Sequence, residues 1–312
     1  MLLYVKQSRP THDDAEMKPP PFRYHDPKTV DEAIGLLGSL ENAKLLAGGQ
    51  SLMPMLNMRF VLPDHVIDLN RVDGLPYIRE QGGWLEIGAM TRQRDLEFSD
   101  AVRARWPIMH EALLQVGHRQ TRNRGTIGGS LCHLDPAAEL VSLAIGHDAI
   151  VTVAGPNGKR ELPFLDFPAG YMMPSLEPNE LLVAIRFPQW APGHGYAFVE
   201  FARRHGDFAI TSAAALLEGD PSGKITRASV TIGGMGTTPS RARELEQAIV
   251  GQMPTAQLLR DACESCRKLE AIDDIHAPAS YRQHLATVLS RRALEKAYAR
   301  LTGTETASAK PH

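Results

Sequence analysis

Two glycine-rich stretches are the residues of this chain whose types and spacing could do chemistry. The first is Ala47-Gly48-Gly49-Gln50-Ser51-Leu52, and the second is Thr126-Ile127-Gly128-Gly129-Ser130. Because glycine reaches positive φ without steric cost, consecutive N–H groups can converge on an anion. Each stretch alone is also typical of a tight turn between strands. Together they favour a binding site for a diphosphate-containing cofactor, with one stretch on each side of the cofactor.

The flanking sequence predicts the elements that position these stretches. Residues 44–47 form a short apolar run that is typical of a strand, and Ser51 adds a hydroxyl donor that could cap the next segment. Asp135 followed by Pro136 is the pattern of an N-cap with proline at the first helical position, which predicts a helix over 136–146. Thr29 with Glu32 is a capping box that predicts a helix to about Gly38.

The remaining pattern predicts a mixed chain with a boundary near residues 188–195, which hold two prolines and two glycines. Before it we expect strands at 65–69, 84–89, 149–154 and 181–187, a short helix capped by Thr91, and a helix over 101–116. After it we expect a small antiparallel sheet from 197–202, 212–217 and 228–232. Three helices, at 241–250, 255–271 and 279–301, then close the chain.

One further glycine motif, at residues 232–239, could indicate a second nucleotide site, because an expected strand leads through Gly233, Gly234 and Gly236 toward an expected helix. A dinucleotide-binding fingerprint places a third glycine where this chain has Pro239, and no βαβ unit follows. We therefore interpret the motif as a strand-to-helix turn with Pro239 near the first helical turn.

Composition is typical of a large globular chain and excludes some classes of function. The 312 residues are 43% hydrophobic and carry a formal charge of −2, without a clustered basic stripe that would indicate a nucleic-acid partner. No apolar run is long enough for a membrane span, and the first residues lack a secretory signal, so we expect a cytoplasmic protein. Cys132, Cys263 and Cys266 are then expected to be reduced and structural.

Four segments of the chain resemble one known family. Residues 44–60 (KLLAGGQSLMPMLNMRF) and 123–140 (NRGTIGGSLCHLDPAAEL), together with 203–209 and 281–285, are similar to the FAD-binding medium subunit of molybdenum hydroxylases. These are enzymes of the carbon monoxide dehydrogenase, xanthine dehydrogenase and caffeine dehydrogenase type. The resemblance covers residues 17–301, and the two glycine motifs are specific in this order and spacing.

The resemblance implies an α+β fold in two domains. Residues 17–193 would form an FAD-binding domain of the vanillyl-alcohol-oxidase (PCMH) type, with subdomains 17–72 and 73–193. Residues 194–302 would form an antiparallel sheet with helices, as in the C-terminal domain of the carbon monoxide dehydrogenase flavoprotein. Residues 1–16 would be an extra segment, either a disordered extension or the product of an upstream start, and residues 303–312 would be a tail.

The resemblance also assigns cofactor-binding residues. Backbone amides of Gly48, Gly49, Gln50 and Ser51 would hold the pyrophosphate of FAD, with Ala47 and Leu52 beside them. Thr126, Gly128, Gly129 and Ser130 would line the other side of the cofactor, and Ile127 would contact the flavin ring.

Several other residues have more than one possible role. Asp135 either caps its own helix or lies close to the cofactor. Arg203, Arg204 and Asp207 form a surface ion-pair group or lie near the flavin edge. His133 could form a covalent bond to the flavin, but the medium subunits of this family hold FAD noncovalently, and we expect the same here. We name no catalytic acid–base pair and no metal ligand.

The implied function is electron transfer within a complex. Three cysteines cannot ligate iron–sulfur clusters, which need four ligands each, so the 2Fe-2S clusters are expected on a small partner subunit. The molybdenum cofactor is expected on a large partner subunit, and the assembly as a dimer of heterotrimers. A free-standing FAD-dependent oxidase or reductase, and a cofactor-carrying assembly factor, are the alternatives; the substrate and the final electron acceptor stay open.

Overall fold

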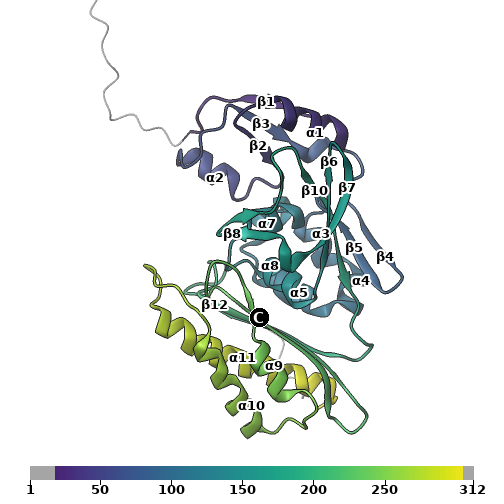
Figure 1. The fold of residues 1–312 in the computed structure, drawn as a ribbon, viewed down its shortest axis with the longest axis vertical. Helices are drawn as coiled ribbons and strands as arrows, with labels where there is room; N and C mark the ends of the chain where they lie inside the picture. Colours follow the sequence, from purple (N-terminus) through teal and green to yellow (C-terminus); the bar gives the residue numbers. More distant parts are fainter. Residues whose placement is uncertain (1–17, 305–312) are drawn as a thin grey trace, which may run out of the picture.

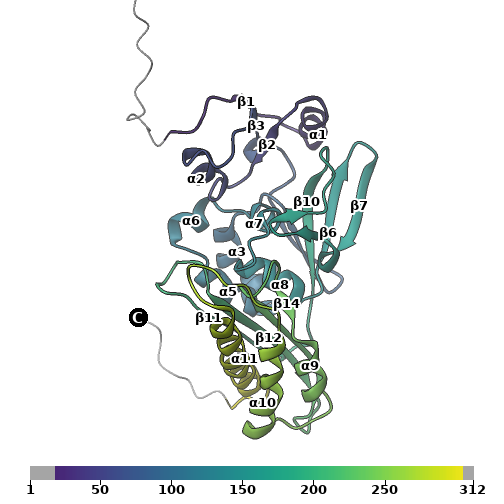
Figure 2. The ribbon, with the colours of Figure 1, turned by 60° about the vertical axis from the view of Figure 1, so that its left-hand side comes forward.

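A computed structural model describes residues 18–304 of the chain, so the predicted extension and most of the predicted tail lie outside the described residues. Three sheets follow one another along the long axis of the molecule (Figure 1). The N-terminal sheet lies at one end, the largest sheet and a group of helices occupy the middle, and the C-terminal sheet with its helices occupies the other end (Figure 2).

The N-terminal sheet is parallel, with strand order β1-β3-β2. Its strands are β1 (Arg23–His25), β2 (Ala43–Leu46) and β3 (His65–Asp68), and its connecting helices are α1 (Val30–Ser39) and α2 (Leu52–Asn57). Parallel strands that are joined by helices have their carboxyl ends at one edge of the sheet, which is where open α/β sheets bind ligands. The ends of β2 and β3 therefore meet at that edge.

The capping box at the start of α1 is confirmed. Thr29 Oγ1 accepts a hydrogen bond from the Glu32 amide at 3.1 Å, and Glu32 Oε2 accepts one from the Lys28 amide at 2.6 Å. The first contact satisfies an amide that the first helical turn leaves unpaired, and the second pairs the amide of the residue before the N-cap. The buried face of α1, with Ala33 and Ile34, then packs into the core between the first two sheets.

The middle sheet is antiparallel, with order β4-β5-β10-β6-β7. The predicted strands at 84–89, 149–154 and 181–187 are confirmed here. Buried aromatic side chains, among them Trp106, Phe164 and Phe187, fill the core between this sheet and its helices. The strands are β4 (Ile78–Gln81), β5 (Trp84–Gly88), β6 (Ile150–Gly155), β7 (Gly158–Pro163) and β10 (Leu181–Pro188), with a small pair β8 (Pro168–Gly170) and β9 (Met173–Pro174).

The helices of the middle region are shorter than the sequence pattern predicts. Pro107 cannot donate an amide hydrogen bond, so it ends the expected helix over 101–116 and begins the next one. The six helices are α3 (Gln93–Phe98), α4 (Asp100–Arg105), α5 (Pro107–Gln115), α6 (Arg119–Arg124), α7 (Ile127–His133) and α8 (Glu139–Gly146).

Two predicted helix caps in this region are wrong. The helix expected at Pro136 begins at Glu139 instead, because the Asp135 carboxylate accepts from the Ala137 amide at 2.8 Å and closes a separate turn. Thr91 does not cap α3; its hydroxyl donates to the Tyr77 carbonyl at 2.8 Å and accepts from the Tyr77 amide at 3.0 Å.

The C-terminal sheet is antiparallel with order β11-β12-β13-β14, and the three predicted strands are confirmed. Helices α9 to α11 cover one face, and α5 and α8 of the middle region lie against the other (Figures 1 and 2). The elements are β11 (Gly195–Phe201), β12 (Thr211–Gly219), β13 (Ile225–Gly233), β14 (Ser240–Arg241), α9 (Arg243–Ile249), α10 (Ala256–Cys263) and α11 (Ala279–Leu301).

Two details of this region differ from the sequence prediction. Pro239 precedes the short strand β14 rather than a helix, and α9 begins only at Arg243. The helix expected over 255–271 ends at Cys263 and continues as the 3-10 turn η3 (Glu264–Lys268).

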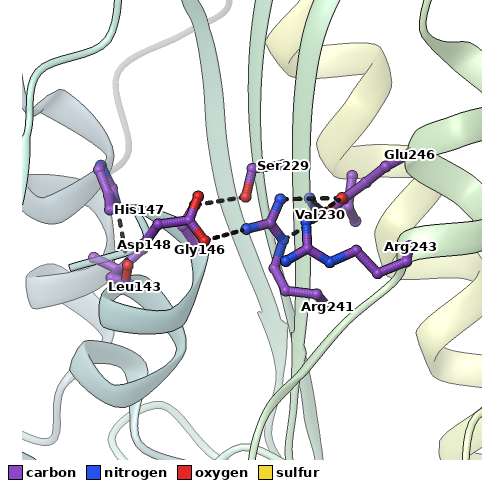
Figure 3. A network of polar contacts seen from close by, with 9 residues as sticks. All are labelled: Leu143, Gly146, His147, Asp148, Ser229, Val230, Arg241, Arg243 and Glu246. Atoms are coloured by element: carbon purple, nitrogen blue, oxygen red, sulfur yellow. Dashed lines mark hydrogen bonds and ion pairs between the residues drawn. The ribbon is translucent and has the colours of Figure 1, made fainter. Parts of the chain in front are cut away.

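A polar network joins the middle region to the C-terminal sheet (Figure 3). Arg241 donates to Glu246 through Nε at 2.6 Å and Nη2 at 3.0 Å, and to Asp148 through Nη1 at 3.0 Å. Beside it, Ser229 Oγ donates to the Gly146 carbonyl at 2.6 Å. These bonds tie the end of α8 to β13 and β14 and hold the two regions in one orientation.

Among residues 18–304, no helix is long and apolar enough to cross a membrane. Within the same residues, no three histidine, cysteine, aspartate or glutamate side chains gather in a group that could hold a metal ion.

Candidate cofactor site

A pocket of about 300 Å³ lies at the carboxyl ends of β2 and β3. Helix α2 contributes Met53 and Pro54 to its lining, and α6 contributes its last residue, Arg124. Four of the predicted cofactor residues, Ala47 to Gln50, line it. The full lining is Leu46, Ala47, Gly48, Gly49, Gln50, Met53, Pro54, Asp68, Asn70 and Arg124.

The amides of the loop that enters α2 are free to bind a ligand. Within the described part of the chain, the N–H groups of Gly48, Gly49, Gln50 and Ser51 donate no hydrogen bond. Backbone amides are normally paired with protein or solvent, and consecutive free amides before a helix form an anion site. This loop therefore fits a phosphate or diphosphate group.

Backbone conformation explains one glycine of this loop, and close packing explains the other. Gly49 has a φ of +74°, which an L side chain rarely adopts. A Cβ on Gly48 would lie 2.4 Å from the Arg124 carbonyl oxygen, so the loop rests directly on the end of α6. Ser51 occupies the N-cap position of α2, but its hydroxyl makes no capping bond, so the predicted cap is wrong.

The structure brings the second glycine stretch against the first. A Cβ on Gly129 would lie 3.3 Å from Ala47 Cβ and 3.9 Å from the Gly48 nitrogen. The second stretch opens helix α7, which the sequence analysis did not predict. Here Thr126 Oγ1 accepts from the Gly129 amide at 3.1 Å.

The amides of the second stretch are already used within the protein. Ile127 donates to the Thr91 carbonyl, Gly128 to the Ala89 carbonyl and Ser130 to the Thr126 carbonyl, at 2.8 to 3.1 Å. A Cβ on Gly128 would lie 2.7 Å from both Ala89 Cβ and Ala89 O. The glycines of this stretch therefore let α7 pack closely against neighbouring backbone, whereas the amides that are free to bind a ligand belong to the first stretch.

Sequence reasoning missed three polar residues of the pocket, Asp68, Asn70 and Arg124. Asn70 Nδ2 donates to the Ala47 carbonyl at 3.0 Å, and the Asn70 amide donates to Asp68 Oδ1 at 2.8 Å. Arg92 donates to both Asn70 Oδ1 and the Arg124 carbonyl. For Asp68 and Asn70 the available signal was the end of the predicted strand at 65–69, because parallel strands place such residues at one edge. No comparable signal pointed to Arg124, which ends α6.

The remaining predicted residues lie outside the pocket lining. Asp135 closes the turn between α7 and α8, and Leu52 is the first residue of α2. His133 is half-buried at the end of α7, and burial lowers its pKa. Arg203, Arg204 and Asp207 are exposed, and within residues 18–304 they form no ion pair with one another or with other groups.

Two carboxyl groups lie close together where α8 meets the C-terminal sheet. Burial, with the nearby Glu200 carboxylate as the next cause, raises the pKa of Glu139 to about 8. Burial also raises the pKa of Glu200 to about 7, and its Oε2 is buried without a hydrogen-bond partner among the described residues. Arg122 lowers the pKa of Glu139 only slightly, and its guanidinium is paired with Glu97 at 2.8 Å. Burial and the neighbouring carboxylate therefore both favour the neutral form of Glu139.

Comparison with known proteins matches both halves of the chain. Residues 20–190 match the FAD binding domain in molybdopterin dehydrogenase, and residues 196–297 match the CO dehydrogenase flavoprotein C-terminal domain. The chain is 39% identical to the 6-hydroxypseudooxynicotine dehydrogenase complex subunit alpha of Paenarthrobacter nicotinovorans, over 93% of this chain and 98% of the relative.

Two further similarities cover nearly the whole chain. It is 38% identical to the carbon monoxide dehydrogenase medium chain of Hydrogenophaga pseudoflava, over 91% of this chain and 99% of the relative. The solved carbon monoxide dehydrogenase from that organism superimposes with a TM-score of 0.88 at 40% identity, covering 90% of this chain and 99% of the other.

The chain belongs to the family of FAD-binding medium subunits of molybdenum hydroxylases. It is a flavoprotein subunit of an oxidoreductase, and the molybdenum cofactor of such complexes belongs to other subunits. The free amides of Gly48 to Ser51 and the close contact of the two glycine stretches fit FAD as the group bound here.

Proposed function

We propose that this chain holds FAD noncovalently and passes electrons from 2Fe-2S clusters on a small partner subunit to an external acceptor. A large partner subunit carries the molybdenum cofactor, and the complex is a dimer of heterotrimers. Support comes from the family, from relatives that are medium chains or subunits of complexes, and from the small number of cysteines in this chain.

One observation carries the proposal: the amides of Gly48 to Ser51 donate no hydrogen bond within the described residues, and the first three of these four residues line the pocket at the end of β2. Each charge-assisted hydrogen bond to a pyrophosphate contributes about 1.5 to 3 kcal/mol, so several sustain tight binding without a covalent link. Arg124, an exposed basic residue, lines the same pocket and adds a positive charge near it. Ala47 and Leu52 flank the loop on its two sides.

The second stretch is proposed to support this loop from behind. Gly129 and Thr126 hold α7 against Ala47, while Ile127, Gly128 and Ser130 anchor the start of the helix. Asp135 is proposed to lie near the cofactor at the other end of α7. When bound, FAD supplies the redox chemistry, and the chain's residues position it and shield it from water.

Isolation of the protein tests the cofactor. The purified chain is expected to be yellow and to release intact FAD into the supernatant on acid or heat denaturation, because His133 lies outside the pocket lining. Flavin that stays with the precipitated protein would contradict noncovalent binding. A folded, colourless preparation that does not bind added FAD would contradict the proposal itself.

Stopped-flow absorbance tests the place of the chain in electron transfer. In the assembled complex, flavin absorbance is expected to bleach on addition of the hydroxylation substrate. In the lone chain it is expected to bleach only with dithionite, because the substrate site lies on another subunit. Rapid substrate-driven bleaching of the lone chain would indicate a free-standing oxidase instead.

A further inference from the structure

Five exposed basic residues form a surface beside the candidate cofactor site. They lie at the start of α6 and on the loop between β11 and β12, which the fold brings together. The backbone of Gly206 lies directly on the His118 imidazole, because a Cβ there would be 2.4 Å from His118 Cε1. We call this set the basic surface: His118, Arg119, Arg203, Arg204 and His205.

The cations of the basic surface are not neutralised within the described residues. Arg119, Arg203 and Arg204 form no ion pair there, and Asp207 is the one carboxylate in the loop. The rings of His118 and His205 lie 6.3 Å apart, so the two segments pack closely even though both carry basic groups. Since the whole chain has a formal charge of −2, this local excess of positive charge is not a general property of its surface.

The shape of the basic surface suits a protein better than a small anion. Small ligands bind in concave pockets, whereas these side chains are exposed and line neither of the two pockets described for residues 18–304. The larger of these pockets, of about 640 Å³, lies at the far end of α11, around Tyr298 and Thr302. Arginine is enriched at protein interfaces, where its fork pairs with carboxylates.

Helix α6 connects the basic surface to the cofactor pocket. Arg119 is its first residue and Arg124, which lines the pocket, is its last. Six residues at 1.5 Å each span about 9 Å. A protein that docks on the basic surface therefore comes close to whatever the pocket holds.

We infer that the basic surface docks an acidic face of the iron–sulfur partner chain and so brings its clusters close to the flavin. The inference rests on the proposed function, because it takes the electron-delivering subunit as the partner. Opposite charges steer two proteins together and fix their register, and salt screens this attraction. Assembly through this surface is therefore sensitive to ionic strength.

Charge reversal tests the surface in the full-length chain. The tagged chain is co-expressed with its two partner subunits and purified over a series of salt concentrations, and iron and acid-labile sulfide are measured per FAD. The double variant Arg203→Glu/Arg204→Glu is expected to retain iron and sulfide at least about tenfold less than the wild type at low salt, with FAD content unchanged. The matched control Lys159→Glu/Lys224→Glu makes the same charge change on two distant hairpins and is expected to behave as wild type.

The possible outcomes separate the two proposals. If the wild type carries no iron–sulfur chain, the proposed function fails and the docking surface fails with it. If wild type and variant retain iron and sulfide equally at every salt concentration, the proposed function stands and the docking surface is wrong. An unchanged iron–sulfur content together with a loss of ADP binding by calorimetry would also overturn it, because the arginines would then serve a small anion.

Discussion

At the scale of single residues, Gly49 is the position where backbone conformation and ligand binding coincide. Its φ is +74° and a Cβ would lie 3.2 Å from Met53 Cγ and 3.3 Å from Leu46 Cδ1. Gly49→Ala is expected to weaken FAD binding at least about tenfold, because an L residue in this conformation costs about 1 to 2 kcal/mol and the loop can avoid that cost by turning its amides away. Fluorescence titration of FAD into the apoprotein measures the change.

Gly82 provides a matched control for this substitution. It also has a positive φ, of +59°, but it lies in the turn between β4 and β5, and a Cβ there has nothing within 4 Å. Gly82→Ala therefore carries similar backbone strain without touching the pocket. If both variants lose the same affinity, the Gly49 effect comes from the fold and not from the site.

The Glu139 carboxyl predicts how stability depends on pH. Its pKa is about 8 in the folded protein, above the ordinary value of 4.5, so its neutral form stabilises the fold at low pH. That contribution is lost as pH rises from about 5 through 8. In this range the Glu139 carboxyl of the unfolded chain is ionised, whereas in the folded chain it stays neutral until the pH reaches its raised pKa. The wild type is expected to lose about 1 to 3 kcal/mol of stability from this group between pH 6 and 9.

Urea unfolding of Glu139→Gln tests this dependence. The amide keeps the volume of the side chain but cannot ionise, so the variant's stability is expected to change less between pH 6 and 9 than that of the wild type. The exposed Glu41→Gln is the control. An identical slope with pH in wild type and Glu139→Gln would contradict a neutral, buried carboxyl at this position.

At the scale of elements, α7 depends on a glycine that lets its first turn lie on β5. Gly128→Ala would place a Cβ 2.7 Å from the Ala89 Cβ and carbonyl oxygen, so the helix must shift. The expected loss is about 1 to 3 kcal/mol of unfolding free energy, as for overpacking in a core. Thermal or urea unfolding measures it.

The same substitution in α1 is the control for α7. Gly35 is helical, and a Cβ there meets nothing within 4 Å, so Gly35→Ala is expected to stabilise the protein by about 0.5 to 1 kcal/mol. Equal effects of the two substitutions would show that α7 does not pack as closely as the structure indicates.

Short helices mark the limit of sequence prediction at this scale. The capping box of Thr29 and Glu32 predicted α1 correctly, because both hydrogen-bonding partners lie within four residues. Helices α2, α6 and α7 have six or seven residues each, and proline or paired glycines stand inside two of them. Their stability comes from packing against other elements, which local propensity does not contain.

At the scale of the whole molecule, Arg241 holds the middle region and the C-terminal sheet together (Figure 3). Its side chain is 7% exposed and pairs with Glu246, which is equally buried, and with Asp148 across the contact. Arg241→Ala is expected to cost about 3 to 5 kcal/mol, because it leaves the Glu246 carboxylate buried without its main partner. The urea midpoint of the full-length chain measures the loss.

Arg243 offers a matched control in the same network. It also contacts Glu246, at 3.4 Å, but its side chain is 56% exposed. Arg243→Ala is expected to change the unfolding free energy by less than about 1 kcal/mol, as for a surface ion pair. If Arg241→Ala is as mild as Arg243→Ala, the network does not hold the two regions together.

The sequence by itself determined the class of fold, the main strands, the helix α1, the family and the first glycine loop. These features depend on hydrophobic periodicity, on caps within a few residues and on the backbone freedom of glycine, all of which are local. The order and spacing of the two glycine stretches in the sequence also indicate a common site.

Only the tertiary structure decided how that site is built. Gly129 meets Ala47, and Asp68, Asn70 and Arg124 join the pocket, because parallel strands end at one edge and α6 lies across it. The structure also divided the roles of the two stretches, with free amides in the first and internally bonded amides in the second. Hydrogen bonds and close contacts between residues far apart in the chain fix these features, and no local pattern encodes them.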